Sequence, residues 1–534
     1  MIGARTRRTA LAFAILAALV AFAYGRATRG GFVFDDHALV EGNPLVRESP
    51  VRPGSLLWQE GEAAGFAYRP VRVLSYQVDH LVAGGLDPRV FHLSNVIWHL
   101  ATTLALFLLA RSMIGSDEAA LFAAAAFAVH PLGSEAVAYV SGRRDLLCAF
   151  FGIAALGAWW WRIAGGGGPG AVAGSLACGL LALGAKETAL VLPLLAWLAT
   201  FVRPPGGSRA GAPTRAWRGV LLGVAAAVLG AAALYRERIG PVLARAASSP
   251  IARQPALTLR VLGRYLRLAV LPDELQADYR AGAFELPRRA IEARTLSAGL
   301  AVSGVGVLGI LLLRRGAVAG LGLLWFLVAL VPVAQIVPYA EVVAEHNAYL
   351  PLAGLALALG DGFARVVRLS GRRGRAAAGL AAAALACAFA LRTRARVEDW
   401  RDEETLWRAT LDVAPDSVRA LHNLGATLAA DGRPAAALGP LERAYRAAPG
   451  DPDVRRTLAR VLTDTGDGSR AVEVARPLVV DPGDGESWNV LGFAQVAAGD
   501  PAAARASFER ARALGAVAEA DEGLRALDRR GGHP

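Results

Sequence analysis

Two adjacent carboxylates, Asp35 and Asp36, lie a few residues after the first hydrophobic segment of the chain, in the stretch from Gly31 to His37. A carboxylate at the edge of a bilayer must be solvated, paired with a cation or used in chemistry, so the pair predicts a functional site just outside a membrane helix. Adjacent carboxylates titrate as a coupled pair, and the sequence does not say which of the two holds a proton.

Further ionisable residues are predicted to lie on the same side of the membrane, in four separate segments. These residues are Arg69, His130, Glu135, Arg143, Arg144, Asp145, Lys186, Glu187, Glu345 and His346. Each could be an ordinary solvated loop residue, but together they favour a site. Lys186 is the only lysine among the 57 basic residues. It is either retained for function or a chance survivor that snorkels to the interface.

A predicted amphipathic helix over residues 257–271 adds a second basic feature. Arg260, Arg264 and Arg267 are spaced by four and three residues, so they share one stripe of this helix. Guanidinium groups match the oxygens of a lipid phosphate, which makes Arg264 a candidate phosphate ligand. The alternative is an interfacial helix that binds no ligand.

The composition favours a polytopic membrane protein. The chain has 534 residues, of which 54% are hydrophobic, and its mean hydropathy is +0.38. The three cysteines lie within apolar runs, so they indicate neither a disulfide framework nor a metal site. The net charge of +12 comes largely from arginines in short loops, where they act as topology signals and not as nucleic-acid ligands.

Apolar segments of about 20 residues predict a bundle of about eleven membrane spans in an all-α fold. The predicted spans cover residues 9–24, 92–112, 118–133, 145–162, 169–185, 187–202, 218–235, 294–313, 317–337, 348–366 and 376–391. The first span follows Arg5, Arg7 and Arg8 and resembles an uncleaved signal anchor with a cytoplasmic N-terminus. Arginines recur in alternate loops on that side, which places Asp35, Asp36 and the C-terminal region outside.

The chain becomes polar and repetitive after residue 392. Leu424-Gly425, Leu458-Ala459 and Leu491-Gly492 recur at spacings of 34 and 33 residues. This period, with small residues where helices pack closely, is typical of tetratricopeptide repeats. We therefore predict a membrane domain over 1–392 and an extracytoplasmic α-solenoid over 393–534, with a half unit at 400–415 and units at about 416–449, 450–482 and 483–516.

The order of the motifs resembles the transmembrane and tetratricopeptide-repeat O-mannosyltransferases. The motifs are Phe34-Asp35-Asp36, Asn43-Pro44, Tyr68-Arg69-Pro70, Phe91 to Asn95 with His99, His130-Pro131 to Val137, Gly142 to Asp145, and Lys186-Glu187, followed by the repeats. The resemblance covers nearly the whole chain. It implies a GT-C-type fold, a polyprenyl-phosphate sugar donor, and Ser or Thr hydroxyls of exported proteins as acceptors.

The resemblance also suggests roles for the candidate residues. Asp35 or Asp36 would be the base in a single inverting displacement, because a phosphate-linked sugar is already activated. Arg143, Arg144, Lys186 and Arg264 would bind the departing phosphate. Arg69, His130, Glu135, Asp145, Glu187, Glu345 and His346 would orient the sugar or the acceptor. No cofactor is implied. A divalent metal could bridge the acidic pair, but no ligand spacing demands one. The composition resembles that of a high-GC bacterium, so the expected location is the inner membrane.

Two other function classes stay open. A lipid-linked glycan ligase or lipid-modifying transferase would use the same donor and acidic pair with a non-protein acceptor. A catalytically silent scaffold would instead use the repeats to assemble export or envelope factors. The expected partners are the lipid bilayer, a polyprenyl-phosphate sugar and exported acceptor proteins, which the repeats could recruit. Nucleic acid is not expected to be a partner.

Overall fold

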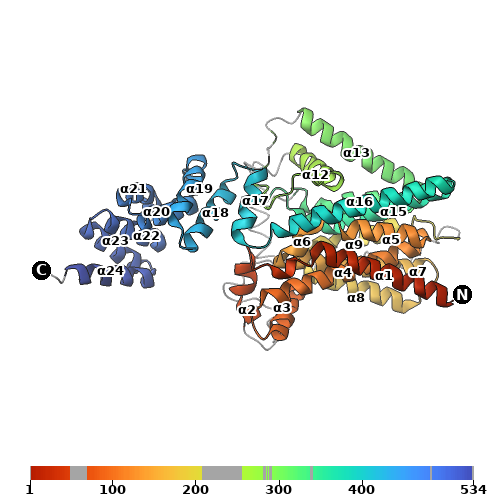
Figure 1. Ribbon diagram of the computed structural model, residues 1–534, viewed down its shortest axis with the longest axis horizontal. Helices are drawn as coiled ribbons and strands as arrows, with labels where there is room; N and C mark the ends of the chain where they lie inside the picture. Colours follow the sequence, from red (N-terminus) through yellow and green to blue (C-terminus); the bar gives the residue numbers. More distant parts are fainter. Residues whose placement is uncertain are drawn as a thin grey trace. The chain divides into compact units, whose positions relative to one another are not determined.

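The fold is described from a computed structural model that covers residues 2–47, 69–206, 255–280, 284, 287, 292–336, 341–480 and 484–531. The chain divides into two compact units (Figure 1). The first unit comprises Met1–Tyr279 and Glu285–Asp402, and the second comprises Arg280–Phe284 and Glu403–Pro534. The division falls ten residues after the predicted boundary at 392, because α16 (Arg372–Glu398) continues through that position.

The first unit contains the apolar helices. Six spans within the described residues are long and apolar enough to cross a bilayer. The helices within them are α1 (Ile2–Tyr24), α4 (Pro88–Ile114), α7 (Arg143–Ile163), α13 (Ala293–Arg314), α15 (Tyr349–Leu369) and α16. Shorter apolar helices are α8 (Pro169–Ala185), α9 (Leu192–Ala199) and α14 (Val318–Leu330). These helices indicate a multi-pass membrane protein. Eleven spans are not confirmed, and the predicted span 218–235 lies outside the described residues.

One predicted span is broken. The sequence predicts a span over 118–133, but α5 (Asp117–Ala128) ends before His130, and the chain bends by 54° into the short segment Pro131–Ala138. The residue before a proline is disfavoured in helical conformation, which accounts for the extended backbone at His130. The bend separates α5 from α6 (Ser134–Ala138), and α6 carries Glu135.

Neighbouring apolar helices pack closely where small residues meet. Helix α7 lies along α8 (Figure 1), and α14 packs against α15. A Cβ atom at Gly322 of α14 would meet the backbone of Gly354 and Ala358 on α15. The missing side chain therefore allows the two helices to approach each other, as small residues do in membrane bundles.

Three shorter helices of the first unit contain no predicted span. They are α2 (Pro44–Arg47), α3 (Pro70–Ala83) and α12 (Pro255–Val270). Proline at the first position suits the start of α3, because the missing N–H has no intrahelical partner there. Helix α12 corresponds to the predicted amphipathic helix over 257–271.

The second unit is a series of helices that match the predicted repeats. They are α17 (Glu403–Val413), α18 (Val418–Ala430), α19 (Pro434–Ala447), α20 (Pro452–Asp464), α21 (Gly468–Ala475), α22 (Gly485–Ala497), α23 (Pro501–Ala513) and α24 (Val517–Gly531). Each predicted unit holds one helix pair, and α17 forms the half unit. A Cβ atom at Gly425 of α18 would overlap Leu441 of α19, so this repeated small residue sets the spacing within the pair.

Candidate functional site

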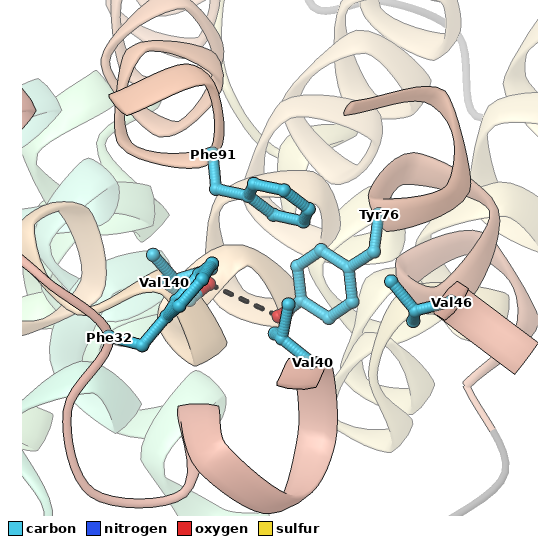
Figure 2. Packing of buried hydrophobic residues seen from close by; sticks show 6 residues of the cluster. All are labelled: Phe32, Val40, Val46, Tyr76, Phe91 and Val140. Atoms are coloured by element: carbon cyan, nitrogen blue, oxygen red, sulfur yellow. Dashed lines mark hydrogen bonds between the residues drawn. The ribbon is translucent and has the colours of Figure 1, made fainter. Parts of the chain in front are cut away.

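A hydrophobic cluster fixes the segment that carries the acidic pair. Figure 2 shows side chains from this segment, from α2, from α3, from α4 and from the turn before α7 packed together. The residues are Phe32, Val40, Val46, Tyr76, Phe91 and Val140. The hydroxyl of Tyr76 donates a hydrogen bond of 3.1 Å to the carbonyl of Val140 (Figure 2). The cluster therefore holds the acidic segment against α3 and the start of α7.

The backbone is strained immediately before the acidic pair. Phe34 has a φ of 55°, a left-handed conformation that side-chain-bearing residues rarely adopt. Such a conformation costs about 1–3 kcal/mol and is found disproportionately at functional sites. The N–H of Gly31 is anchored to the carbonyl of Arg401 at 2.9 Å. The next two side chains, Asp35 and Asp36, lie in different environments.

Asp36 is fully buried and held by hydrogen bonds. Its Oδ1 accepts from the backbone N–H of Ser141 at 2.8 Å and from the hydroxyl of Ser141 at 2.6 Å. Its Oδ2 accepts from the N–H of Val33 at 3.2 Å. Burial raises the pKa of Asp36 to about 7, although these hydrogen bonds oppose the rise. Asp36 thus links the acidic segment to the start of α7.

Asp35 differs from its neighbour because it is only half-buried. Its carboxylate lies close enough to Arg144 and Tyr139 to act on both electrostatically. The two predicted catalytic carboxylates are therefore unequal. Asp36 is tied into the fold, whereas Asp35 remains accessible beside a guanidinium group.

Arg143 and Arg144 look equivalent in the sequence but occupy different places. Consecutive residues on a helix are about 100° apart. Arg143 is fully buried: it pairs with Asp79 at 2.6 Å, donates to the carbonyl of Phe91 at 2.6 Å and bonds the amide oxygen of Asn95. Each of its nitrogens already has a protein partner. Arg144 alone of the two faces the acidic segment.

A chain of polar contacts runs from Arg144 to α6. Its Nη2 lies 3.0 Å from Nε2 of His346, and Nδ1 of His346 lies 2.6 Å from Oε1 of Glu135. The other oxygen of Glu135 accepts from the N–H of His346 at 3.0 Å. Glu135 therefore fixes the orientation of the imidazole, and the imidazole in turn positions the guanidinium of Arg144.

Lys186 extends the same network. It is buried between α8 and the turn that begins at Glu187, and its Nζ lies 2.6 Å from Oδ1 of Asp145 and 2.7 Å from Oδ1 of Asn347. Burial lowers the pKa of Lys186, and the nearby Asp145 carboxylate opposes this. Asp145 also lies 3.5 Å from Nε of Arg144, so one carboxylate serves two cations.

Two further predicted residues border this network. Arg69 forms a bidentate pair with Glu187, with distances of 2.9 and 3.0 Å from Nη2. Glu345 is fully buried and accepts from the N–H of Gln276 at 2.6 Å and from the hydroxyl of Tyr279 at 2.8 Å. These contacts tie the first loop and the segment after α12 to the network.

His130 and Arg264 lie at the edge of this arrangement. Nε2 of His130 lies 3.0 Å from the carbonyl of Ala269 at the end of α12. Arg264 pairs with Glu274 at 2.8 Å and lies over the ring of Tyr279. The hydrogen bond from Arg264 lowers the pKa of Glu274. Both residues already have protein partners and do not contact the acidic pair.

Several residues of the site were not selected from the sequence. Ser141, Asn95, Asn347 and Asp79 each contact a charged candidate directly. Asn95 lies within a motif that supports the family resemblance, and Asn347 adjoins His346. For these two residues, the position in the sequence could have indicated a place in the site. Ser141 and Asp79 are ordinary polar residues in the sequence, and only the fold assigns them partners.

A metal site is not assembled in the part of the chain that the structure describes. No group of three or more His, Cys, Asp or Glu side chains in that part could hold an ion. Both oxygens of Asp36 already accept hydrogen bonds, which leaves Asp35 as the freer donor of the pair. The described geometry thus offers one readily available carboxylate for a cation.

The comparisons with known proteins extend over both units. The family model described as "Tetratricopeptide repeat" matches residues 428–480. Protein O-mannosyl-transferase Tmtc1 of Drosophila melanogaster is 28% identical over 518 residues, covering 78% of this chain and 59% of the relative. Protein O-mannosyl-transferase TMTC4 of Mus musculus is 27% identical over 479 residues, covering 78% of this chain and 63% of the relative. The predicted resemblance to this family is confirmed.

A third relative has a higher sequence identity to this chain, but over a shorter stretch. Protein O-mannosyl-transferase TMTC1 of Homo sapiens is 36% identical over 154 residues, covering 27% of this chain and 17% of the relative. The chain spans about three-fifths of the length of the Drosophila and mouse O-mannosyl-transferases. The similarity therefore includes the membrane helices and the repeats but leaves a large part of each relative unmatched.

Proposed function

We propose that the chain is an integral membrane glycosyltransferase that moves a sugar from a polyprenyl-phosphate donor to Ser or Thr hydroxyls of exported proteins. The activity for which its relatives are named, protein O-mannosyl transfer, supports a glycosyltransferase and favours mannose as the sugar. The proposed location is the inner membrane, with the acidic segment and the repeats on the extracytoplasmic side.

The observation that carries this proposal is the unequal acidic pair beside Arg144. A base must be accessible to its substrate, and Asp35 is the half-buried member of the pair. A leaving phosphate requires positive charge, and Arg144 is the cation on which the charge of Asp35 acts. Base and cation therefore lie on adjoining elements, as a displacement at a phosphate-linked sugar requires.

The proposed reaction is a single displacement. Asp35 takes the proton of the acceptor hydroxyl as its oxygen bonds to the anomeric carbon. The bond between that carbon and the phosphate oxygen breaks, and the phosphate leaves with the electron pair. Attack from the face opposite the phosphate inverts the configuration. Asp36 serves as the anchor that keeps Asp35 in place through Ser141.

Arg143 and Arg264 have smaller parts in this proposal than their types suggest. The partners of Arg143 are all protein groups, so its role is to hold α3, α4 and α7 together. Arg264 is neutralised by Glu274. Among the predicted residues, Arg144 is the proposed phosphate ligand. His346 positions its guanidinium group, and Lys186 pairs with the neighbouring Asp145.

The test is mass spectrometry of exported proteins from cells that carry the wild type or the double variant Asp35→Asn with Asp36→Asn at matched expression. Loss of Ser- or Thr-linked hexose in the double variant supports protein glycosylation and identifies the acceptors. Arg89→Gln provides a matched control, because Arg89 is exposed at the start of α4. It should leave the glycoproteins unchanged.

Unchanged glycoproteins in the double variant would contradict the proposal. A change in lipid-linked glycans alone would instead indicate a ligase or a lipid-modifying transferase with a non-protein acceptor. If deletion of 417–534 abolishes the phenotype while the acidic pair is dispensable, the chain acts as an assembly scaffold.

A further inference from the structure

Within the part of the chain that the structure describes, Arg72 of α3 is a buried cation without a counterion. Its exposed fraction is only 2%. Its Nε has no hydrogen-bond partner, and no described residue forms an ion pair with it. A buried charge is costly unless it is paired and hydrogen-bonded. Arg72 was not among the residues selected from the sequence, although Arg69 three positions earlier was.

The groups around Arg72 raise this cost. Burial, together with the charges of Arg69 and Arg144, lowers its pKa to about 10, so it remains charged at neutral pH. Its other strong electrostatic neighbours are the phenol groups of Tyr76 and Tyr139. Arg69 is already paired with Glu187. Arg144 has the carboxylate of Asp145 as a partner, whereas Arg72 has no carboxylate partner among the described residues.

The same neighbours place Arg72 beside the acidic pair. Tyr139 interacts electrostatically with Arg72, with Arg144 and with Asp35. Tyr76, one turn after Arg72 on α3, belongs to the hydrophobic cluster that holds the acidic segment (Figure 2). Arg72 on α3 and Arg144 on α7 therefore have Tyr139 as a common electrostatic neighbour.

We propose that Arg72 and Arg144 together bind the phosphate group of an isoprenyl phosphate. The inference rests on the proposed function and adds Arg72 as a ligand of the leaving group. An anion between the two guanidinium groups would supply the counterion that Arg72 lacks. Guanidinium forks bind phosphate oxygens in bidentate fashion, which suits a terminal phosphate better than a point charge would.

The charge balance favours the product phosphate over the donor. The cations Arg72, Arg144 and Lys186 stand against the carboxylates of Asp145, Asp35 and Glu341. A sugar phosphodiester carries about one negative charge, and a phosphate monoester carries about 1.5 to 2. When Asp35 takes the acceptor proton, the net charge of these protein groups becomes more positive by one unit as the phosphate gains negative charge. The attraction between these cations and the phosphate is therefore stronger in the transition state than with the bound donor, and such a difference accelerates the reaction.

The test measures binding of geranylgeranyl phosphate to the full chain in lipid nanodiscs by calorimetry. Losing one bidentate, charge-assisted contact predicts a roughly 10- to 100-fold higher Kd for Arg72→Gln. Arg72→Lys should recover part of the affinity, because it restores the charge without the fork. Arg89→Gln, which removes an exposed arginine, should bind as the wild type does.

The Gln variant should fold, because it removes an unpaired buried charge, and an unchanged or higher Tm would verify this. Competition by inorganic phosphate at similar concentrations would identify a site for the phosphate alone, whereas a preference for the lipid form would identify the headgroup; both support the role of Arg72. Equal Kd values for wild type and Arg72→Gln would overturn it while leaving the proposed function intact. No binding to the wild type would contradict the isoprenyl donor and thus the proposed function itself.

Discussion

Asp36 should make the stability of the protein depend on pH in a defined direction. Burial raises its pKa from 3.8 to about 7, so between these values the folded state binds a proton that the unfolded state has released. Stability from this group is fully present below about pH 4 and is lost as pH rises through 7. One pKa unit corresponds to about 1.4 kcal/mol, so the loss amounts to roughly 4 kcal/mol.

The variant Asp36→Asn isolates this effect, because it cannot ionise. Its amide nitrogen would face the N–H of Val33, or the N–H and hydroxyl of Ser141, at the positions of the present acceptors. An unmet buried donor costs about 1–3 kcal/mol. The wild type should therefore be clearly more stable than the variant near pH 4.5, and this advantage should shrink or reverse near pH 8.

Thermal unfolding of both proteins in the same nanodiscs, followed between pH 4.5 and 8, measures the difference. Other ionisable groups are common to the two proteins and cancel. Parallel pH profiles would refute the argument, because they would mean that Asp36 keeps the same proton affinity in the folded and unfolded chains. A difference that grows with pH would also refute it, since the sign would then be that of a carboxylate stabilised in its charged form.

Further variants test the supporting structure. Lys186→Met leaves Asp145 without its closest cation and should lower the unfolding free energy by about 3 kcal/mol. Adding Asp145→Asn should restore much of this in a double-mutant cycle by thermal unfolding, and additive losses would contradict the pairing. Gly425→Val should destabilise the repeats because its side chain would overlap Leu441. Gly379→Ala, with open space inside α16 and no proline after it, should instead raise the unfolding free energy by up to about 1 kcal/mol. Circular dichroism melting of the chain checks both, and equal effects would refute the packing argument.

Segment-level features could be predicted because they depend on local patterns. Apolar length predicted helices at ten of the eleven proposed spans, and the eleventh lies outside the described residues. The period of 34 residues predicted the repeats, and the family model matches there. The break at Pro131 was harder to foresee, because the apolar run continues through it and only the backbone restriction before proline ends the helix.

Roles within the site could not be predicted, since they depend on where side chains point. Arg143 and Arg144 are adjacent and chemically identical, yet one is enclosed by Asp79 and Asn95 and the other faces Asp35. Arg72 was not selected from the sequence for the same reason. Whether a buried cation has a counterion depends on the groups that the fold places around it, and this cannot be read from the sequence.

The central claim is that Asp35 is the base of a glycosyl transfer. Its most direct test is the rate at which the purified full chain transfers mannose from a polyprenyl-phosphate donor to a Ser- and Thr-containing peptide, followed by mass spectrometry. Loss of a general base predicts that Asp35→Asn is about 10²- to 10⁴-fold slower, with a Tm like that of the wild type. Equal rates for Asp35→Asn and wild type would contradict the claim.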